Sequence, residues 1–232
     1  MLQVRIGPSK RPGILKFWKF IAAALSLASF SIFLLQKYSD IFSLTTEKKA
    51  MSERLKKMKS VNPCPVMICS KEQFSFYIQS GAANVVPPKI CFRNELVLGV
   101  EKKNAGVGIN AVIINGKTGE LIQTGHYNMW DGDVNPLIEL LKTTETGSIV
   151  LMASYDEASS KLNDEARELI LNLGSSFVKS LGFRDNWIFV GGKGAEVDKT
   201  FEKHMKHDPQ NNKYEFWPEL IDLTGCIPKY PN

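Results

Sequence analysis

Residues 181–194 read Leu-Gly-Phe-Arg-Asp-Asn-Trp-Ile-Phe-Val-Gly-Gly-Lys-Gly, and this stretch organises the chain. Trp187–Val190 is aromatic and β-branched and is bounded by Asn186 and Gly191, so it predicts a short buried strand rather than a helix. We expect this strand to be central. The turn before it exposes polar side chains, and the glycines after it allow another backbone or a ligand to come close.

Further alternating or apolar runs elsewhere in the chain predict more strands. They are Phe74–Ile78, Ile109–Ile114, Leu121–Tyr127 and Ile149–Met152. Asn115-Gly116 and the residues up to Gly119 separate the second run from the third. These residue types accept a positive φ, which predicts a hairpin and therefore antiparallel pairing.

Two helices are predicted by apolar positions at helical spacing. One begins after Asn163, carries its apolar positions from Ala166 to Leu173, and has Gly174 at the C′ position. The other has Asp133 as its N-cap and tolerates Pro136 in its first turn. Both apolar faces are narrow, so each helix is expected to pack on a sheet. The fold class is therefore mixed, with sheets flanked by short helices.

Charge is unevenly distributed along the 232 residues. Residues 1–63 hold 12 Lys and Arg against 3 Asp and Glu, whereas residues 64–232 hold 17 against 21. A mildly acidic domain is poorly suited to a polyphosphate backbone, so nucleic acid is not an expected partner.

The N-terminal region has the order of a secretory address. Five basic residues precede the uncharged run 20–36, whose apolar core of 16 residues is short for a membrane span and long for a signal peptide. We therefore predict a signal peptide or an uncleaved signal anchor in residues 1–44, and a basic stem in residues 45–63. If the segment is retained, the basic flank favours a cytoplasmic N-terminus, and membrane contact is limited to this segment. Residues 64–232 are expected to form one domain outside the cytosol in either case.

The four cysteines are Cys64, Cys69, Cys91 and Cys226. An even number in a chain with a secretory address favours disulfides over a metal site. Spacing alone permits three connectivities. In each, Cys226 must pair far back in the sequence and close a loop of more than 130 residues.

Motifs that suggest chemistry fail when their spacing is checked. The sequence at 191–194 lacks the Ser or Thr and the first glycine of a phosphate loop. Residues 131–142 begin like a calcium loop but have Pro136 and Lys142 at the required Gly and Glu positions. His126, His204 and His207 show no metal or triad spacing, and the last two are expected to be solvated. We predict no enzyme activity, no metal and no cofactor.

Ten short motifs, in order along the domain, resemble the cytokine-like secreted family called "family with sequence similarity 3". They are Ser-Gly-Ala-Ala-Asn-Val-Val at 80–86, Pro-Lys-Ile-Cys at 88–91, Gly-Ile-Asn at 108–110, Asp-Gly-Asp-Val at 131–134, Ser-Tyr-Asp at 154–156, Lys-Leu-Asn-Asp at 161–164, Leu-Gly-Phe-Arg-Asp at 181–185, Gly-Gly-Lys-Gly at 191–194, Asn-Lys-Tyr at 212–214 and Gly-Cys-Ile-Pro at 225–228.

The resemblance implies a GG-type lectin (PANDER-like) domain over residues 64–232. This is an α+β fold of two packed β-sheets with short helices outside, closed by disulfides. It further implies that Cys64 pairs with Cys91 and that Cys69 pairs with Cys226. The Cys64 to Cys69 spacing is one residue shorter than is usual in the family.

A related domain in the stem of an O-mannose N-acetylglucosaminyltransferase binds sugar, and the positions resembling its site are Asp156 and Arg184. A carboxylate and a planar multi-donor group can satisfy sugar hydroxyls. The alternative is a plain salt bridge between the two residues. A third family position, usually Arg, is Val107 here. Trp187 would offer an apolar platform, although it is expected in the core.

The resemblance and the secretory address together imply a secreted, non-enzymatic, cytokine-like signalling protein with a carbohydrate-binding domain. Its expected partner is a cell-surface receptor or a glycan. The alternative is a type II membrane protein of the Golgi whose lumenal domain assists glycan processing.

Overall fold

The computed structural model describes residues 25, 27–39, 48, 63–194 and 201–230. The chain forms two compact units, Met1–Val61 and Asn62–Asn232. In the first unit, residues 27–39 are helical. Among the described residues, no helix combines the length and the apolar character needed to cross a bilayer. Most of the predicted signal segment and stem lies outside the described residues.

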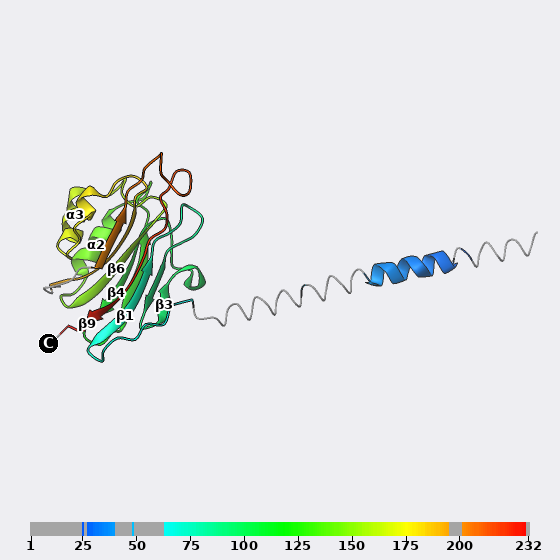
Figure 1. Ribbon diagram of the computed structural model, residues 1–232, viewed down its shortest axis with the longest axis horizontal. Coiled ribbons are helices and arrows are strands. Elements are labelled where there is room, and N and C mark those ends of the chain that lie inside the picture. The colour runs from blue at the N-terminus through cyan, green and yellow to red at the C-terminus, as the bar shows by residue number, and fades with distance from the viewer. Residues whose placement is uncertain (1–24, 26, 40–47, 49–62, 195–200, 231–232) are drawn as a thin grey trace, which may run out of the picture. The chain divides into compact units, whose positions relative to one another are not determined.

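The second unit contains two antiparallel sheets (Figure 1). The four-stranded sheet has the order β3-β2-β1-β9, and the five-stranded sheet has the order β5-β4-β6-β7-β8. The strands are β1 (Gln73–Gln79), β2 (Lys89–Phe92), β3 (Glu95–Leu98), β4 (Gly108–Asn115), β5 (Leu121–Tyr127), β6 (Ser148–Tyr155), β7 (Asn186–Gly192), β8 (Phe201–Met205) and β9 (Asp222–Pro228). The helices are η1 (Val100–Lys102), α2 (Asn135–Thr143), α3 (Asp164–Leu171) and η2 (Val178–Ser180).

The five-stranded sheet lies between two hydrophobic layers. Its inner face packs against the four-stranded sheet around Phe76, Ile90 and Val112, and its outer face packs against α2 and α3 around Trp187 and Ile170. Strands buried on both faces need apolar side chains at successive positions, and all eight residues of β6 are buried. This double burial explains the continuous apolar runs in the sequence.

The predicted fold class of two packed sheets with short helices outside is confirmed, and each of the five predicted strands exists. One expectation was wrong: the centre of the larger sheet is β6, and β7 lies next to the edge strand β8. The sequence patterns did not predict strands β2, β3, β8 and β9. The first two have only four residues each, β8 is largely polar, and β9 contains Gly225 and ends at Pro228.

Both predicted helices pack on the larger sheet. In α3, the Asn163 side chain accepts a hydrogen bond from the Ala166 amide at 2.8 Å, as an N-cap should. In α2 the predicted cap was wrong, because the N-cap position is Val134 and Asp133 instead accepts from the Asn135 amide at 2.9 Å. Gly174, the predicted C′ residue, has a φ of 102° but lies one position beyond the observed C′ site, since α3 ends at Leu171 and its C-cap is Asn172.

The Gly-Gly-Lys segment at the end of β7 allows a close approach within the protein. A Cβ at Gly191 would overlap the backbone carbonyl of Leu173, and one at Gly192 would overlap the Tyr230 hydroxyl. Lys193 extends beyond this strand and donates to the carbonyls of Leu141 and Lys142, both at 2.8 Å. Its ammonium therefore satisfies the C-terminal end of α2. The three residues connect the sheet to both helices and form no phosphate loop.

Two disulfides tie the ends of this unit to its strands. Cys64 is bonded to Cys91 and Cys69 to Cys226, which is the pairing that the family resemblance implies. Cys91 lies in β2 and Cys226 in β9, so both bridges attach the segment before β1 to the four-stranded sheet.

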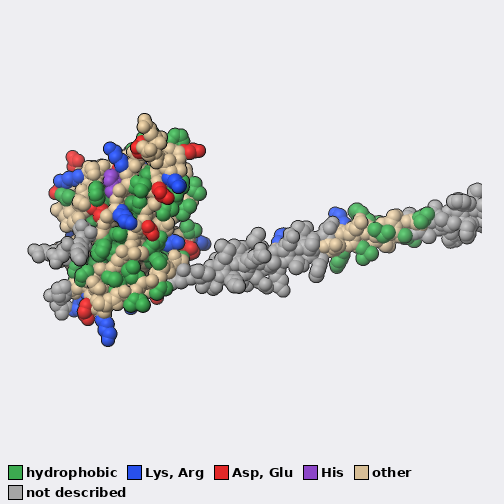
Figure 2. Space-filling model, viewed as in Figure 1, with side chains coloured by type: hydrophobic (Ala, Val, Ile, Leu, Met, Phe, Trp, Pro, Cys, Tyr) green, Lys and Arg blue, Asp and Glu red, His purple; other side chains and the backbone are tan. Residues whose placement is uncertain are grey.

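The face drawn in Figure 2 mixes basic and acidic side chains among exposed hydrophobic ones.

Candidate functional site

Asp156 and Arg184 meet at one end of the larger sheet. Asp156 directly follows β6 and Arg184 lies in the turn before β7, and these strands are antiparallel neighbours. Both residues have left-handed backbones, with φ values of 60° and 58°. Such values are uncommon for residues other than glycine, and they cluster at functional sites. The two side chains line one pocket of about 290 Å³. Its lining consists of Asn84, Val107, Asn128, Trp130, Asp156, Arg184 and Trp217.

The Asp156 carboxylate is oriented by a tryptophan. Its Oδ1 accepts a hydrogen bond from Trp217 Nε1 at 3.0 Å. Burial, and then the negative charge of Asp156, raise the pKa of the neighbouring Tyr155 hydroxyl. That hydroxyl donates to the Asn84 carbonyl at 2.9 Å and so attaches the Asn84 loop to β6. Among the ion pairs of the described residues, none joins Asp156 to Arg184, so the alternative of a plain salt bridge is not supported.

The Arg184 guanidinium stacks on aromatic rings and has no acceptor for its inner nitrogen. Its Cζ lies 4.2 Å from the centre of the Trp217 ring and 4.9 Å from that of Phe183. Within the described part of the chain, Arg184 Nε is one of two buried side-chain polar atoms without a hydrogen-bond partner, the other being the Tyr230 hydroxyl. An unsatisfied buried donor is costly, so this N–H group has an unused capacity to donate a hydrogen bond.

A buried carboxylate holds the two site loops together. Glu157 is fully buried, and its Oε2 accepts from the Arg184 amide at 2.6 Å. Its Oε1 accepts from the amides of Ser159 and Ser160, at 2.6 and 2.8 Å. Since Glu157 follows Asp156 directly, this one side chain fixes the loop after β6 to the turn before β7. The geometry of both site residues therefore depends on it.

Aromatic side chains surround the pocket and remain exposed. Trp130 is 50% exposed and Phe216 is 59% exposed, and the Trp130 ring lies 5.8 Å from that of Phe183. Trp187 takes no part, because it is fully buried and donates through Nε1 to Glu202 at 2.7 Å. Trp217 and Trp130 are therefore the residues that can provide the apolar platform considered for Trp187.

Four lining residues escaped the sequence reasoning, namely Asn84, Asn128, Trp130 and Trp217. The signal available for two of them was a tryptophan in a loop, a segment type that often carries binding residues. Val107, at the position where the family usually has Arg, does line the pocket. Asn110 holds its turn by accepting from the Gly106 amide at 2.9 Å and donating to the Gly106 carbonyl at 2.7 Å.

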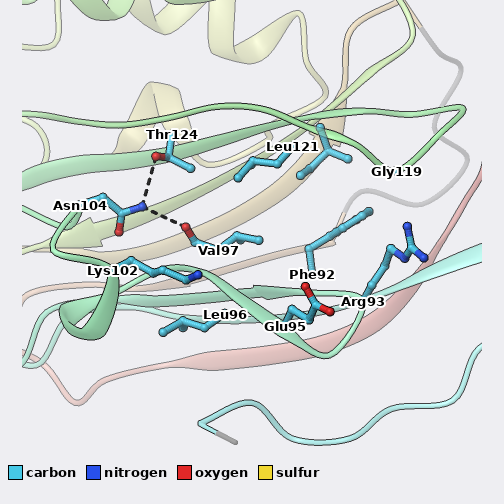
Figure 3. A pocket seen from close by; sticks show the side chains of 11 residues that line it. Phe92, Arg93, Glu95, Leu96, Val97, Lys102, Asn104, Gly119, Leu121 and Thr124 are labelled. Carbon is cyan, nitrogen blue, oxygen red and sulfur yellow. Dashed lines mark hydrogen bonds between the residues drawn. The ribbon is translucent and has the colours of Figure 1, made fainter.

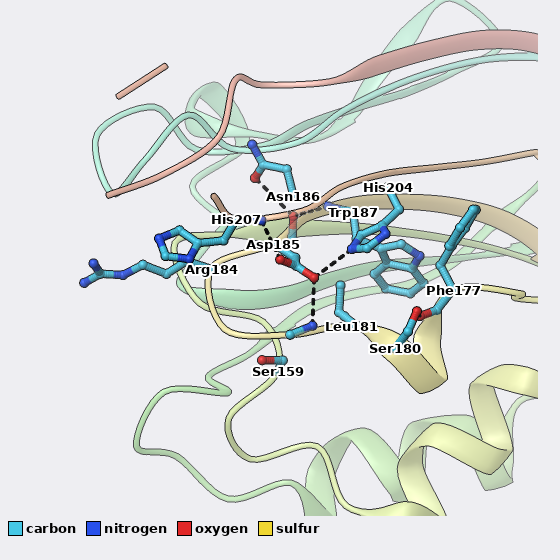
Figure 4. A network of polar contacts seen from close by, with 12 residues as sticks. Ser159, Phe177, Ser180, Leu181, Arg184, Asp185, Asn186, Trp187, His204 and His207 are labelled. Atoms are coloured by element: carbon cyan, nitrogen blue, oxygen red, sulfur yellow. Dashed lines mark hydrogen bonds and ion pairs between the residues drawn. The ribbon is translucent and has the colours of Figure 1, made fainter. Parts of the chain in front are cut away.

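A second polar network lies behind Arg184 and faces the protein interior. Asp185 accepts from the Gly182 amide at 2.8 Å and the His207 amide at 2.7 Å, and its Oδ2 lies 2.7 Å from His204 Nε2. Figure 4 shows these contacts, with the Arg184 side chain pointing away from them. The expectation that His204 is solvated was wrong, because only 12% of its side chain is exposed. Asp185 fixes the turn from which Arg184 projects.

This network should make stability depend on acid pH. Burial alone would raise the pKa of Asp185, but hydrogen bonds from His204, the His207 amide and the Gly182 amide outweigh burial and lower it. A carboxyl group whose pKa is lower in the folded chain stabilises fully above its unfolded pKa of about 3.9 and loses this contribution as pH falls through the folded value. The free energy of unfolding should therefore decline below about pH 4.

Urea unfolding at a series of pH values checks this prediction. Asp185→Asn should lower stability at neutral pH and should flatten the decline in acid, since it removes the titrating group. An unchanged acid dependence in the variant would show that other carboxylates govern it.

A larger cavity lies elsewhere and is lined by neither predicted site residue. It has a volume of about 510 Å³ and lies between the edge strands β3 and β5 (Figure 3). Asn104 crosses it, donating to the Val97 carbonyl at 2.9 Å and to Thr124 Oγ1 at 3.2 Å. These polar atoms already have partners, so we place the candidate site at the smaller pocket, where a buried donor has none.

Within the described ranges, no three His, Cys, Asp or Glu side chains are grouped to hold a metal ion.

The arrangement offers a carboxylate, a guanidinium, two amides and two indole rings around one small pocket. Charged groups make strong hydrogen bonds to hydroxyls, and an aromatic face suits the apolar C–H surface of a ring. These groups match the hydrogen-bonding and stacking needs of a small polar ring.

Comparison with known proteins identifies the family. A family model described as Interleukin-like EMT inducer matches residues 107–195. Protein FAM3C of Danio rerio is 54% identical over 160 residues, which cover 69% of this chain and 70% of the relative. Protein FAM3C of Homo sapiens is 52% identical over 161 residues, covering 69% and 71%. Protein FAM3A of Homo sapiens is 40% identical over 193 residues, covering 83% of each chain. The chain therefore belongs to the FAM3 family of cytokine-like proteins.

Proposed function

We propose that this chain is a secreted, non-enzymatic signalling protein whose globular unit binds a saccharide between Asp156 and Arg184. The observation that carries the proposal is one pocket that presents the Asp156 carboxylate and the Arg184 guanidinium beside two indole rings. A saccharide hydroxyl can accept from the guanidinium while another donates to the carboxylate. Charge-assisted hydrogen bonds of this kind contribute roughly 1.5 to 3 kcal/mol each.

The aromatic residues add a second reason for a sugar ligand. Trp217 is held in place by its hydrogen bond to Asp156 and by the paired backbones of Tyr214 and Trp217. Trp130 is half exposed at the pocket and stacks near Phe183. Val107 stands where the family usually has Arg, so one wall is apolar and Arg184 is the only cation among the described lining residues. We expect a compact, single-ring epitope.

Secretion is the second part of the proposal, and it rests on the basic flank before residues 20–36 and on the four disulfide-bonded cysteines. The competing function is that of a Golgi-anchored glycan-binding accessory, which the length of the uncharged run favours. N-terminal sequencing of the protein from secretory cells separates the two. A mature chain in the medium that starts after residue 36 supports secretion, and a membrane fraction retaining Met1 supports the anchor.

A glycan array on the purified full chain tests saccharide binding. Wild type should select a defined saccharide, and Asp156→Asn should bind it roughly tenfold more weakly, because the amide loses the charge-assisted acceptor. The fold should persist, since Asn tolerates the left-handed backbone and still accepts from Trp217. Glu101→Gln, which removes an exposed carboxylate, is the matched control and should bind as wild type does. Equal binding by all three proteins would refute the assignment of Asp156.

A further inference from the structure

A third pocket, of about 400 Å³, is lined by basic side chains. Four cations come from four separate segments: Lys71 before β1, Arg93 between β2 and β3, Lys117 between β4 and β5, and Lys229 after β9. None of the described residues that line it is acidic. This excess of basic residues is confined to the pocket, because residues 64–232 as a whole carry more acidic than basic residues.

This basic pocket lies at the opposite end of the sheets from the Asp156 pocket. Strand β4 begins next to Val107, which lines the Asp156 pocket, and ends at Asn115, just before Lys117. The two sites are thus separated by the length of an eight-residue strand, which at about 3.3 Å per residue is roughly 25 Å. Substitutions in one site should not affect the other directly.

The backbones that carry the cations are fixed. The Cys69–Cys226 disulfide and the hydrogen bond from the Gln73 amide to the Ser70 carbonyl, at 3.1 Å, hold the segment of Lys71. The Lys117 amide donates to Asn115 Oδ1 at 3.0 Å, and the Lys229 amide donates to the Glu72 carbonyl at 2.9 Å. The fold therefore holds the backbones of these residues around one pocket, so binding an anion needs to order only their side chains.

Arg93 occupies an unfavourable position for its residue type. It is the first residue of the two-residue turn between β2 and β3, with a φ of 53°, and Asn94 follows with a φ of 64°. Glycine or asparagine suits such a turn better than arginine does. An arginine in this conformation is a local cost, which suggests that the residue serves a purpose other than folding.

We propose that the basic pocket binds a sulfated polysaccharide, and this inference rests on the secreted location proposed above. Lys71, Arg93 and Lys229 line one pocket that has no acidic residue among its described lining, which favours a ligand with several sulfates over a neutral sugar. A membrane surface fits less well, because the apolar side chain at the pocket, Phe74, is buried beneath Lys229, whose Nζ lies 5.4 Å from the ring centre. The saccharide pocket and the basic pocket would give the protein two independent contacts.

The test measures binding of a heparin hexasaccharide to the full, disulfide-bonded chain over a range of NaCl concentrations. The double variant Lys71→Gln/Lys229→Gln should bind roughly tenfold more weakly. It should also reduce the slope of log affinity against log salt by about two, since two fewer counterions are released. Arg93→Asn should weaken binding while the melting temperature holds or rises, because asparagine suits the turn. That result separates a binding role from a structural one.

The matched control is Lys161→Gln/Lys213→Gln, which removes two exposed lysines outside the pocket and leaves the basic N-terminal residues unchanged. It should bind as wild type does. Asp156→Asn should also leave hexasaccharide binding intact, so failure of the saccharide proposal would not mimic failure of this one. Equal weakening by both lysine pairs would overturn the basic pocket as the site. Equal displacement by a desulfated hexasaccharide, or by a DNA oligonucleotide of the same charge, would overturn sulfated polysaccharide as its ligand.

Discussion

Removal of the Cys69–Cys226 disulfide by Cys69→Ser/Cys226→Ser should lower the free energy of unfolding by about 5 kcal/mol. The bridge spans 157 residues, so it removes much conformational freedom from the unfolded chain. Loss of the Cys64–Cys91 bridge, which spans 27 residues, should cost only about 3.5 kcal/mol on the same chain-entropy relation. Both costs are large against the 5 to 15 kcal/mol that stabilises a typical domain.

Urea unfolding of the two double-serine variants under identical conditions measures the difference. The Cys69/Cys226 variant should unfold at the lower urea concentration, with an m-value at least as large as that of wild type. If the Cys64/Cys91 variant were the less stable of the two, native contacts around Cys64 would outweigh loop length, and the entropic explanation would fail.

Trp187→Ala should cost about 3 to 5 kcal/mol, because it leaves a large cavity between the five-stranded sheet and the helices. The Trp187 side chain is fully buried in that core, and its ring stacks on Phe189 with centroids 5.8 Å apart. Its hydrogen bond to Glu202 contributes less, since Glu202 keeps the Ser176 amide and hydroxyl as donors, at 2.8 and 2.7 Å.

Trp187→Phe is the control for this substitution. It retains most of the buried ring but removes the indole N–H, so it should cost about 1 to 2 kcal/mol. Thermal and urea unfolding of both variants provide the comparison. Equal losses from the two substitutions would show that the hydrogen bond to Glu202, rather than packing, is what the fold requires at this position.

The sequence predicted β1, the strands of the larger sheet that are buried on both faces and, through the hairpin signal before it, the edge strand β5. It missed the short interior strand β2 and the edge strands β3, β8 and β9. Strand β7 and its neighbours must present apolar side chains to two layers, so their pattern is continuous and legible. Strands β3, β8 and β9 lie at sheet edges, where one side of the backbone meets solvent and polar residues are tolerated. Local sequence patterns do not determine the order of strands in a sheet. For this reason β7 was predicted at the centre of the sheet, where the structure has β6.

The candidate site was predictable only in part. Asp156 and Arg184 were reached through family resemblance, and the structure places them on one pocket. Trp217 arrives from the loop between β8 and β9, more than 30 residues from Arg184 in sequence, so no local spacing could reveal it. Glu157 was equally hidden, because its role depends on donors from two loops that meet only in the folded chain.

The most direct test of the account compares wild type with Arg184→Lys for saccharide affinity and melting temperature. Lysine keeps the charge but lacks the planar donor fork and the Nε–H group, so binding should weaken by about 1 to 2 kcal/mol while the melting temperature holds. A variant that melts several degrees lower, in a protein that binds no saccharide even as wild type, would contradict the claim that Arg184 faces a ligand.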